Sequence, residues 1–584
     1  MRLFLCFILF CLTTIEGQAA KAYPHPVKTI QSDGTILIVV ARGDESFHYY
    51  MTTDSVLLYH EGKDFFIAQV NDDGSLSPTS QLAHEKGNRK VTEEHLVQVQ
   101  DRHLFFQFLT KQTQKRVMQR EPIKVDHTYL PHTGQPRIAV ILAQFTDDTF
   151  MDEDPKSVFE QYLNAEEIDN QVGNQTVGRN YGSVRRYFKD MSFGLFEPQF
   201  DLYGPVTLSH PTSYYGAGKD RMDLFIPEVC ELAEEQGLKF SEYDSNDDGY
   251  VDLVYVIYAG YSECFTGTPT TCIWPKSGII SAFEMDGKYI YRYGVNSELN
   301  AFPGAWENPP YERINGIGLF CHEFSHCMGM PDFYPTSTTA QNAFNPGMER
   351  WSLMDDGEYV DNGYTPTEYT AWEREAMGWF EIDTLNTSGF YTMTNINEEG
   401  GKAYRIINSE DSSECFILQN IQLTGWNSKL DGHGMLVTHV DFSPSIFRNN
   451  TVNNTIGHSR MTFIPADEEY ISAFQIDAET ITRQMYCDNH AGDPFPGTKD
   501  VTAINEFPAY TGIMKERVYD ITEHQERVSF YFDDGTTGIK QTIISQKENG
   551  KHEIFTLDGR SMGYNIATLP KGIYIVNGQK TVIR

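Results

Sequence analysis

The sequence predicts an α+β protein in which a mixed α and β unit lies between β-rich units. Short apolar runs broken by turn residues fill residues 23–120, helical and strand patterns alternate over residues 137–380, and β-like runs return over residues 388–534. The expected segments are a leader at 1–22, a β-rich unit with its linker at 23–130, the mixed unit at 131–385, a β-sandwich-like unit at 386–535 and a small β module at 536–584.

The strands and the linker follow from local composition. Apolar and β-branched runs predict strands, and a basic stretch that contains proline predicts a linker. The predicted strands are 35–40, 64–70, 137–145, 252–259, 434–440, 528–532 and 571–578, and the predicted linker is 111–133.

Composition and charge exclude several classes of protein. The chain has 584 residues, 40% hydrophobic and 13% aromatic, which is enough for several packed cores. The formal net charge of −35 predicts a surface that repels nucleic acid and anionic membranes. We therefore expect no nucleic-acid partner and no insertion into a membrane.

The N-terminus has the order of a secretory signal peptide. Arg2 precedes an apolar run from Leu3 to Leu12, and small residues follow up to Ala22. The run is too short to cross a bilayer comfortably. We therefore expect a protein that is secreted or attached to the cell surface.

Cysteine usage fits an exported protein with at least one free thiol. Nine cysteines are present, and two of them leave with the leader, so an odd number remains. Cys264 and Cys272 bracket a short loop and can pair in an oxidising compartment. Cys321 and Cys327 flank a histidine pair but fall on other faces of the predicted helix, so we expect core thiols rather than metal ligands.

The histidine pair carries the most specific chemistry. His322 and His326 are four residues apart in a predicted helix over 314–328, which puts them on one face, one turn apart. Two imidazoles so placed can bind one zinc ion at about 2.1 Å. Glu323, next to the first histidine, is placed to take a proton from the water that zinc activates.

The residues after the pair supply a third ligand. Gly329 permits a left-handed turn and Pro331 stops the helix, so the chain can fold back and bring Asp332 to the metal. A catalytic zinc site needs three protein ligands and one open position. The alternatives are that Asp332 orients a histidine instead, or that the ligand comes from a predicted helix over 368–379, which carries Glu368, Glu373 and Glu375.

A second metal site is predicted in an aspartate-rich loop. Oxygen-bearing side chains at positions 1, 3, 5 and 9 with glycine at position 6 match a calcium loop, but position 12 lacks the glutamate of an EF-hand. The alternative is an Asp-rich turn capped by its own side chains. The predicted calcium residues are Asp244, Asn246, Asp248 and Asp252 at these four positions, together with Tyr250 at position 7, where calcium loops supply a backbone carbonyl.

The pattern His-Glu-x-x-His-x-x-Gly-x-x-Asp at 322–332 resembles the immune inhibitor A-like (M6) family of secreted metallopeptidases. The likeness extends over roughly residues 23–534, including 183–194, 372–379, 432–441 and 492–497. It implies a zincin- or metzincin-like catalytic domain, with Met354 in a methionine turn beneath the zinc. The N-terminal unit, including residues 42–50, resembles the propeptide region of the same family. It contains no cysteine after the leader, which excludes a cysteine switch, so a carboxylate such as Asp44 is the candidate to cap the zinc.

The C-terminal module, with its motifs at 555–560 and 569–576, resembles the sorting domain of type IX secretion substrates, which implies a secretion machinery as partner. The alternative is an ordinary terminal β-hairpin.

Together these features predict a secreted zinc endopeptidase with protein or peptide substrates, zinc in the site and a structural calcium ion. Glu323 acts as general base, and Tyr359 or Tyr364 are the side chains considered for the oxyanion. One alternative is a non-catalytic, calcium-stabilised cell-surface binding module on a peptidase scaffold. The other is a zinc hydrolase that acts on something other than peptides.

Overall fold

The computed structural model describes the chain in segments separated by short gaps. The segments are residues 22, 26–43, 48–106, 108, 130–168, 179–216, 221–264, 272–300, 313–398, 400–476, 480–535, 554–556, 561–563, 569–576 and 579–583. The predicted leader, apart from Ala22, and the predicted latency residue Asp44 lie outside these residues.

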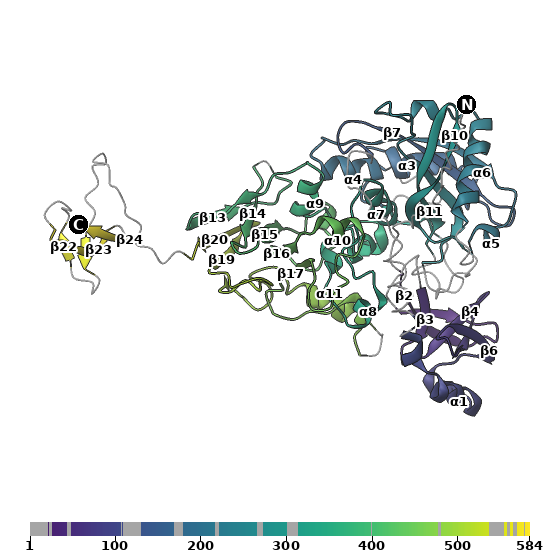
Figure 1. The fold of residues 1–584 in the computed structure, drawn as a ribbon, viewed down its shortest axis with the longest axis horizontal. Helices are drawn as coiled ribbons and strands as arrows, with labels where there is room; N and C mark the ends of the chain where they lie inside the picture. Colours follow the sequence, from purple (N-terminus) through teal and green to yellow (C-terminus); the bar gives the residue numbers. More distant parts are fainter. Residues whose placement is uncertain are drawn as a thin grey trace, which may run out of the picture.

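The N-terminal unit is an antiparallel sheet with its strands in chain order, β1-β2-β3-β4-β5-β6. Alternate apolar residues, such as Leu37 and Val39, form its core. Figure 1 shows this sheet in purple beside the central part of the molecule. The elements are β1 (Val27–Ile30), β2 (Ile36–Gly43), β3 (His48–Thr52), β4 (Leu57–Glu61), β5 (Asp64–Val70), β6 (Leu76–Leu82), η1 (Lys86–Asn88) and α1 (Val91–Val99).

The central unit contains a five-stranded sheet in the order β10-β11-β9-β7-β8. The neighbours β11, β9, β7 and β8 pair in parallel, and β10 is the antiparallel edge. Side chains of β7 (Arg137–Gln144) alternate between two cores. Val140 faces the helices α3 (Pro155–Asn164), α4 (Val184–Met191) and α7 (Ile317–Cys327), while Ile141 faces α6 (Met222–Glu235). Because both faces are covered, β7 is apolar along its whole length, as expected for a central strand.

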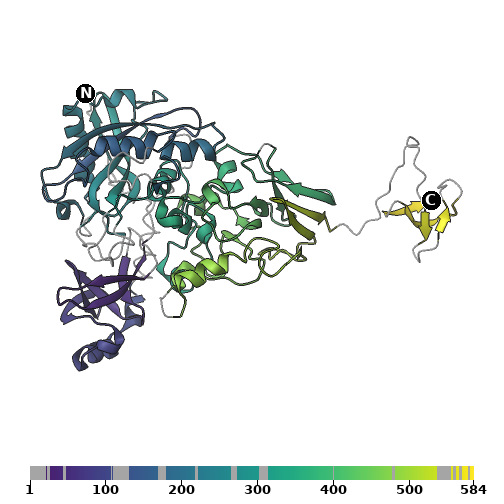
Figure 2. The ribbon, with the colours of Figure 1, turned by 180° about the vertical axis from the view of Figure 1, so that it is seen from behind.

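The elements of this unit, which are shown in Figures 1 and 2, run as follows. They are β7 (Arg137–Gln144), α3 (Pro155–Asn164), α4 (Val184–Met191), β8 (Gln199–Thr207), α5 (Thr212–Tyr215), α6 (Met222–Glu235), η3 (Phe240–Glu242), β9 (Val254–Tyr261), β10 (Lys276–Met285), β11 (Lys288–Leu299), α7 (Ile317–Cys327), α8 (Thr338–Asn342), η5 (Glu349–Trp351), η6 (Asp356–Gly363) and α9 (Ala371–Ala376).

Two further sheets follow, in the orders β12-β14-β15-β16-β17 and β13-β20-β19-β18. A shared apolar core, including Phe416 and Phe530, lies between them. Their elements are β12 (Asp383–Thr384), β13 (Gly389–Met393), β14 (Ala403–Ile407), β15 (Glu414–Ile421), η7 (Gly425–Asn427), β16 (Gly434–Asp441), α10 (Pro444–Arg448), β17 (Met461–Phe463), η8 (Ala473–Gln475), α11 (Arg483–His490), β18 (Ala503–Ile504), β19 (Arg517–His524) and β20 (Arg527–Asp533).

The other face of the first of these sheets belongs to the core of the central unit. Ile417 and Leu436 are packed into the same buried apolar core as Phe320 and Phe324 of α7. The core that supports α7 therefore extends across residue 385, where the sequence predicted a boundary.

The last strands form a small antiparallel sheet in the order β22-β21-β23-β24, with its own core around Ile554 and Tyr574. It is drawn apart from the other sheets in Figures 1 and 2. Its strands are β21 (Ile554–Thr556), β22 (Ser561–Gly563), β23 (Gly572–Val576) and β24 (Gln579–Ile583).

Three expectations need correction. The helix predicted over 368–379 is the shorter α9, because Thr370 and Glu373 cap its first turn reciprocally. Cys264 and Cys272 do not form a disulfide in the described structure. His132, at the end of the predicted linker, is built into the fold: its Nε2 lies 2.8 Å from the carbonyl oxygen of Met328, and its own carbonyl accepts from Trp379.

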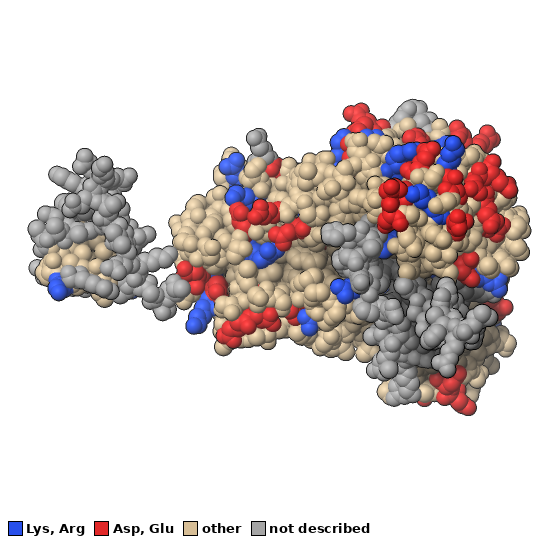
Figure 3. Space-filling view, turned by 45° about the horizontal axis from the view of Figure 1, so that its top comes forward, with Lys and Arg blue, Asp and Glu red and all other residues tan. Residues whose placement is uncertain are grey.

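Acidic and basic side chains lie on the surface of the molecule. Figure 3 shows that acidic side chains on the pictured face gather, interspersed with basic ones, at the end that carries the five-stranded sheet. Among the helices in the described segments, none has the length and apolar character needed to cross a membrane.

Close backbone packing of α7 gives a first prediction, for Gly318→Ala. A Cβ at Gly318 would lie 2.0 Å from the carbonyl oxygen of Glu358 in η6, which is backbone and cannot give way locally. We expect the free energy of unfolding to fall by about 1–3 kcal/mol, measured by urea denaturation. Gly87→Ala is the control, because nothing lies within 4 Å of its Cβ, and equal losses in both variants would contradict the prediction.

Candidate metal centre

The metal-site residues stand on α7 and on the turn that follows it. The helix starts after Gly316 and ends at Cys327. Gly329 has φ +96, and the amide of Met330 donates to the carbonyl of Ser325, so the end of the helix is closed as the sequence predicted. The reversed chain then places Asp332 opposite the helix face that carries the histidines.

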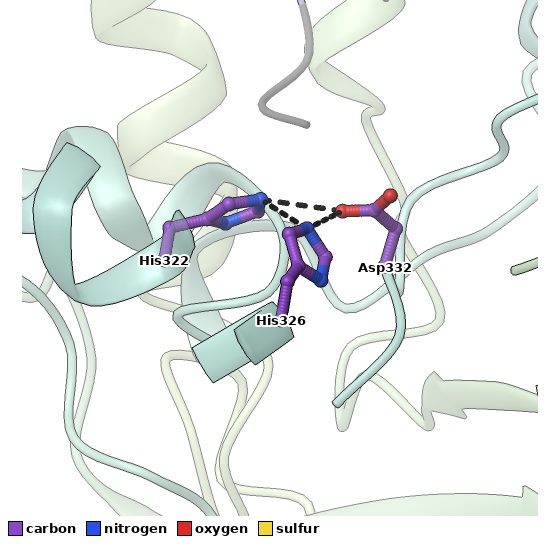
Figure 4. A group of neighbouring side chains, drawn as sticks. All are labelled: His322, His326 and Asp332. Carbon is purple, nitrogen blue, oxygen red and sulfur yellow. Dashed lines mark hydrogen bonds and ion pairs between the residues drawn. The ribbon is translucent and has the colours of Figure 1, made fainter. Parts of the chain in front are cut away.

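Three side-chain atoms converge (Figure 4). His322 Nε2 and His326 Nε2 lie 3.1 Å apart, and Asp332 Oδ1 lies 3.3 Å from the first and 3.2 Å from the second. Among the described residues, this is the one group of three or more His, Cys, Asp or Glu side chains close enough to share a metal ion. The rival carboxylates lie elsewhere.

Two backbone carbonyls determine which ring nitrogen of each imidazole carries the hydrogen. His322 Nδ1 lies 2.9 Å from the carbonyl oxygen of Leu353, and His326 Nδ1 lies 2.7 Å from that of Met330. A carbonyl oxygen only accepts, so each Nδ1 carries a hydrogen, and in the neutral rings both Nε2 atoms present lone pairs. Two lone pairs 3.1 Å apart repel each other unless a cation lies between them.

The distances fit such a cation. A tetrahedral site with bonds of ~2.0–2.1 Å has edges of ~3.3 Å, and the three distances between ligand atoms are 3.1, 3.3 and 3.2 Å. Two imidazoles and one carboxylate, with the fourth corner open, form the donor set of a catalytic zinc site. The residues present therefore fit zinc.

The two imidazoles differ in their electrostatics. Burial would lower the pKa of His326, but the carboxylate of Asp332 raises it above its usual value. Burial lowers the pKa of His322, which favours the neutral ring. Burial would raise the pKa of Asp332, but the imidazoles of His326 and His322 hold it well below its usual range. The carboxylate is therefore ionised and available to a metal.

The segment after η5 holds both sides of the site. Besides the carbonyl of Leu353, which accepts from His322, the carbonyl of Met354 accepts from the amide of Phe333, next to Asp332. Met354 is itself fully buried in the core. Leu353 and Met330 could not be predicted as partners of the histidines, because a backbone carbonyl that accepts a hydrogen bond leaves no mark in residue type.

The rival glutamates have other partners. Glu368 accepts from Asn397 and Asn427 and faces Arg374, Glu373 accepts from Ser352 and the amide of Thr370, and Glu375 is paired with Arg405. None belongs to the three-residue group.

Glu323 and the two tyrosines considered for the oxyanion differ in their surroundings. Glu323 is completely buried, and its carboxylate adds to the burial that raises the pKa of Tyr255 on β9. The hydroxyl of Tyr364 donates to the carbonyl of Ile314. Tyr359 packs in the apolar core shared with the N-terminal sheet. Both tyrosines are engaged in packing or bonding in this state.

The site is closed to solvent. His322 and Glu323 have no exposed surface, and Asp332 and His326 are only 1% and 3% exposed. Leu319 of α7 belongs to one apolar core with Val39 and Tyr50 of the N-terminal sheet. The apolar core of that sheet therefore extends to the helix that carries the histidines.

The aspartate-rich loop is held by its own hydrogen bonds. Asp244 accepts from the amides of Asp248 and Gly249 at 3.1 and 2.9 Å, and the ammonium of Lys288 lies 2.7 Å from its Oδ2. The amide of Tyr250 donates to Asp248, and Ser245 donates to Asp252, whose pKa is raised by burial. The calcium ion stays a prediction from the spacing.

Residues 128–383 match the family model described as immune inhibitor A peptidase M6, catalytic domain. The match includes the histidine pair, Glu323 and Asp332, and it ends before β13. It supports a metallopeptidase.

Two relatives bear names of the same kind. Pre-pro-metalloprotease PrtV of Vibrio cholerae serotype O1 is 22% identical over 237 residues, 34% of this chain and 24% of that protein. Immune inhibitor A of Bacillus thuringiensis subsp. alesti is 22% identical over 284 residues, 41% of this chain and 39% of that protein. The chain thus spans less than half the length of either relative.

Proposed function

We propose that this chain is a secreted zinc-dependent endopeptidase, made as a zymogen, that hydrolyses peptide bonds within proteins. The observation that carries the proposal is the convergence of His322 Nε2, His326 Nε2 and Asp332 Oδ1 with both imidazole hydrogens committed to carbonyls. The match to the M6 catalytic domain supports peptide bonds as the target.

The reaction needs two proton transfers. His322, His326 and Asp332 would hold zinc, which when bound polarises the scissile carbonyl and makes a water molecule more acidic. Glu323 takes the proton of the water that attacks the carbonyl carbon, and then gives it to the amine nitrogen as the C–N bond breaks. Glu323 follows His322 on α7 and is completely buried.

The closed site supports synthesis as a zymogen. A protein substrate cannot reach side chains that are 0–3% exposed. Side chains of the N-terminal sheet contact residues outside it. Arg42 donates to the carbonyl of Phe474 at 3.0 Å, and His48 lies 3.1 Å from Glu263 and packs on the ring of Trp274. Removal of the sheet uncovers the face of α7 at Leu319.

The proposed function is tested by cutting the chain after it has folded. A recognition sequence for a specific protease is placed within residues 111–124, and casein cleavage is measured before and after the cut, with and without a zinc chelator. We expect cleavage only after the cut and only without chelator. Equal activity of the uncut protein would contradict latency. A cut protein that holds zinc but cleaves nothing would favour the binding-module alternative.

Two further proposals rest on the sequence alone. The module at 536–584 directs type IX secretion, followed by release or attachment to the cell surface. The loop from Asp244 to Asp252 binds a structural calcium ion.

A further inference from the structure

The loop after α10 reaches the metal centre through one side chain, Asn450. Its Oδ1 accepts from the backbone amide of Asp332 at 2.7 Å, and its Nδ2 donates to Asp332 Oδ2 at 2.5 Å. The other carboxylate oxygen, Oδ1, is the one that faces His322 and His326. Asn450 therefore holds Asp332 at both its backbone and its outer oxygen, and leaves the inner oxygen directed at the imidazoles.

The amide group is suited to this task. Asparagine offers a donor and an acceptor on one planar group, so it can bind a backbone amide and a carboxylate at once. Asn450 has φ +53, a left-handed conformation that asparagine tolerates better than most residues. It is 5% exposed, so water does not compete freely for these bonds.

The rest of the loop is bonded to the same stretch of chain. Asn453 donates to the carbonyl of Phe333 at 2.7 Å, and Thr336 donates to the carbonyl of Asn450 at 2.8 Å. Asn454 accepts from the amide of Ser337 at 2.7 Å and donates to Thr336 at 2.8 Å. The bonds of Asn453 and Thr336 hold the loop at Asn450 against this stretch, whereas the side chain of Asn454 bonds only to Ser337 and Thr336 and does not contact Asp332.

We infer that Asn450 is a positioning residue for the third metal ligand, and that residues 384–535 complete the metal centre rather than forming a separate appendage. Asn450 lies beyond residue 383, where the catalytic-domain match ends. The inference rests on the proposed function for the metal at Asp332. A carboxylate can rotate about its last bond, and a fixed outer oxygen leaves one orientation for the inner one.

The test compares two matched substitutions in the full chain. Asn450→Asp keeps the shape, the left-handed conformation and the acceptor for the Asp332 amide, but replaces the donor by a second carboxylate oxygen. Asn454→Asp makes the same chemical change in the same loop, where the donor goes to Thr336 instead. Asn450→Gly removes both bonds and is tolerated at φ +53.

Zinc affinity is measured by competition with a chelator, and ligand geometry by the visible absorption of the cobalt-substituted protein. We expect the zinc Kd to rise about 10–100-fold in both Asn450 variants, with an altered cobalt spectrum. Asn454→Asp should keep the parent's zinc Kd and spectrum, whatever its melting temperature.

Three outcomes would overturn the inference. In the first, Asn450→Asp and Asn450→Gly keep the parent's zinc Kd and cobalt spectrum. In the second, Asn454→Asp weakens zinc as much as they do, which would show a merely structural effect of the loop. In the third, the parent chain itself binds no zinc, and the proposed function then fails together with the inference. If the parent binds zinc and all three variants match it, only the inference fails.

Discussion

Glu323→Gln is expected to slow peptide-bond cleavage about 10²–10⁴-fold, the usual contribution of a general acid–base group. Glutamine keeps the shape of the side chain but cannot take a proton from water or return one to the amine. Glu323 is not one of the three converging ligands, so the zinc content should stay at about one per chain. The measurement is kcat for a peptide substrate on the cut protein, with zinc measured in the same sample.

Glu375→Gln is the matched control for this result. It makes the same change in another glutamate, one that is paired with Arg405 on β14 and lies outside the metal group. Its cleavage rate should stay close to that of the parent. A Glu323→Gln protein that cleaves at the parental rate would show that Glu323 is not the general base. If the variant lost its zinc, the lower rate would reflect loss of metal and not loss of proton transfer.

Asp332→Ala is expected to have the second large effect, on metal binding. Loss of the carboxylate leaves two imidazoles, so zinc should be retained at well below one per chain after dialysis, and cleavage should be lost. At free zinc about 1,000-fold above the Kd, binding stabilises the parent by about 4 kcal/mol, and chelation removes that stabilisation. The unfolding free energy of the variant should be insensitive to the chelator.

The control for this experiment is the chelated parent, because it separates loss of metal from damage to the fold. Removal of Asp332 also frees Asn450, whose Nδ2 then lacks its acceptor, so a modest loss of stability without metal is expected as well. If Asp332→Ala kept one zinc and full activity, the third ligand would have to be Glu368, Glu373 or Glu375. That result would contradict the structure, in which none of these glutamates belongs to the metal group.

Much of the site was predicted because its parts are close in sequence. The helix from Ile317 to Cys327 follows from an apolar run without proline, and the turn at Gly329 follows from glycine before Pro331. The predicted strands at residues 64–70 and 137–145 correspond to β5 and β7 within one residue at each end. Such features depend on neighbouring residues only.

The predictions failed where a distant contact or a capping bond overrides the local pattern. The helical pattern over 368–379 includes Glu368, but Asn427, 59 residues on, accepts from the amide of Glu368 and holds it outside α9. The basic stretch at 111–133 has the composition of a linker, yet the imidazole of His132 contacts the carbonyl of Met328, at the C-terminal end of α7. Local composition carries no information about either partner.

Sequence alone therefore predicted His322 and His326 on one helical face, with Glu323 next to the first, and a fold-back of the chain that brings Asp332 to the metal, because backbone periodicity and two turn residues determine those positions. Only the tertiary structure revealed that Leu353, 31 residues away, orients His322, that Asn450, 118 residues away, holds Asp332, and that the apolar core of the N-terminal sheet reaches α7 at Leu319. These contacts depend on how apolar faces of distant segments pack into shared cores, and one residue's neighbours in sequence do not determine that packing.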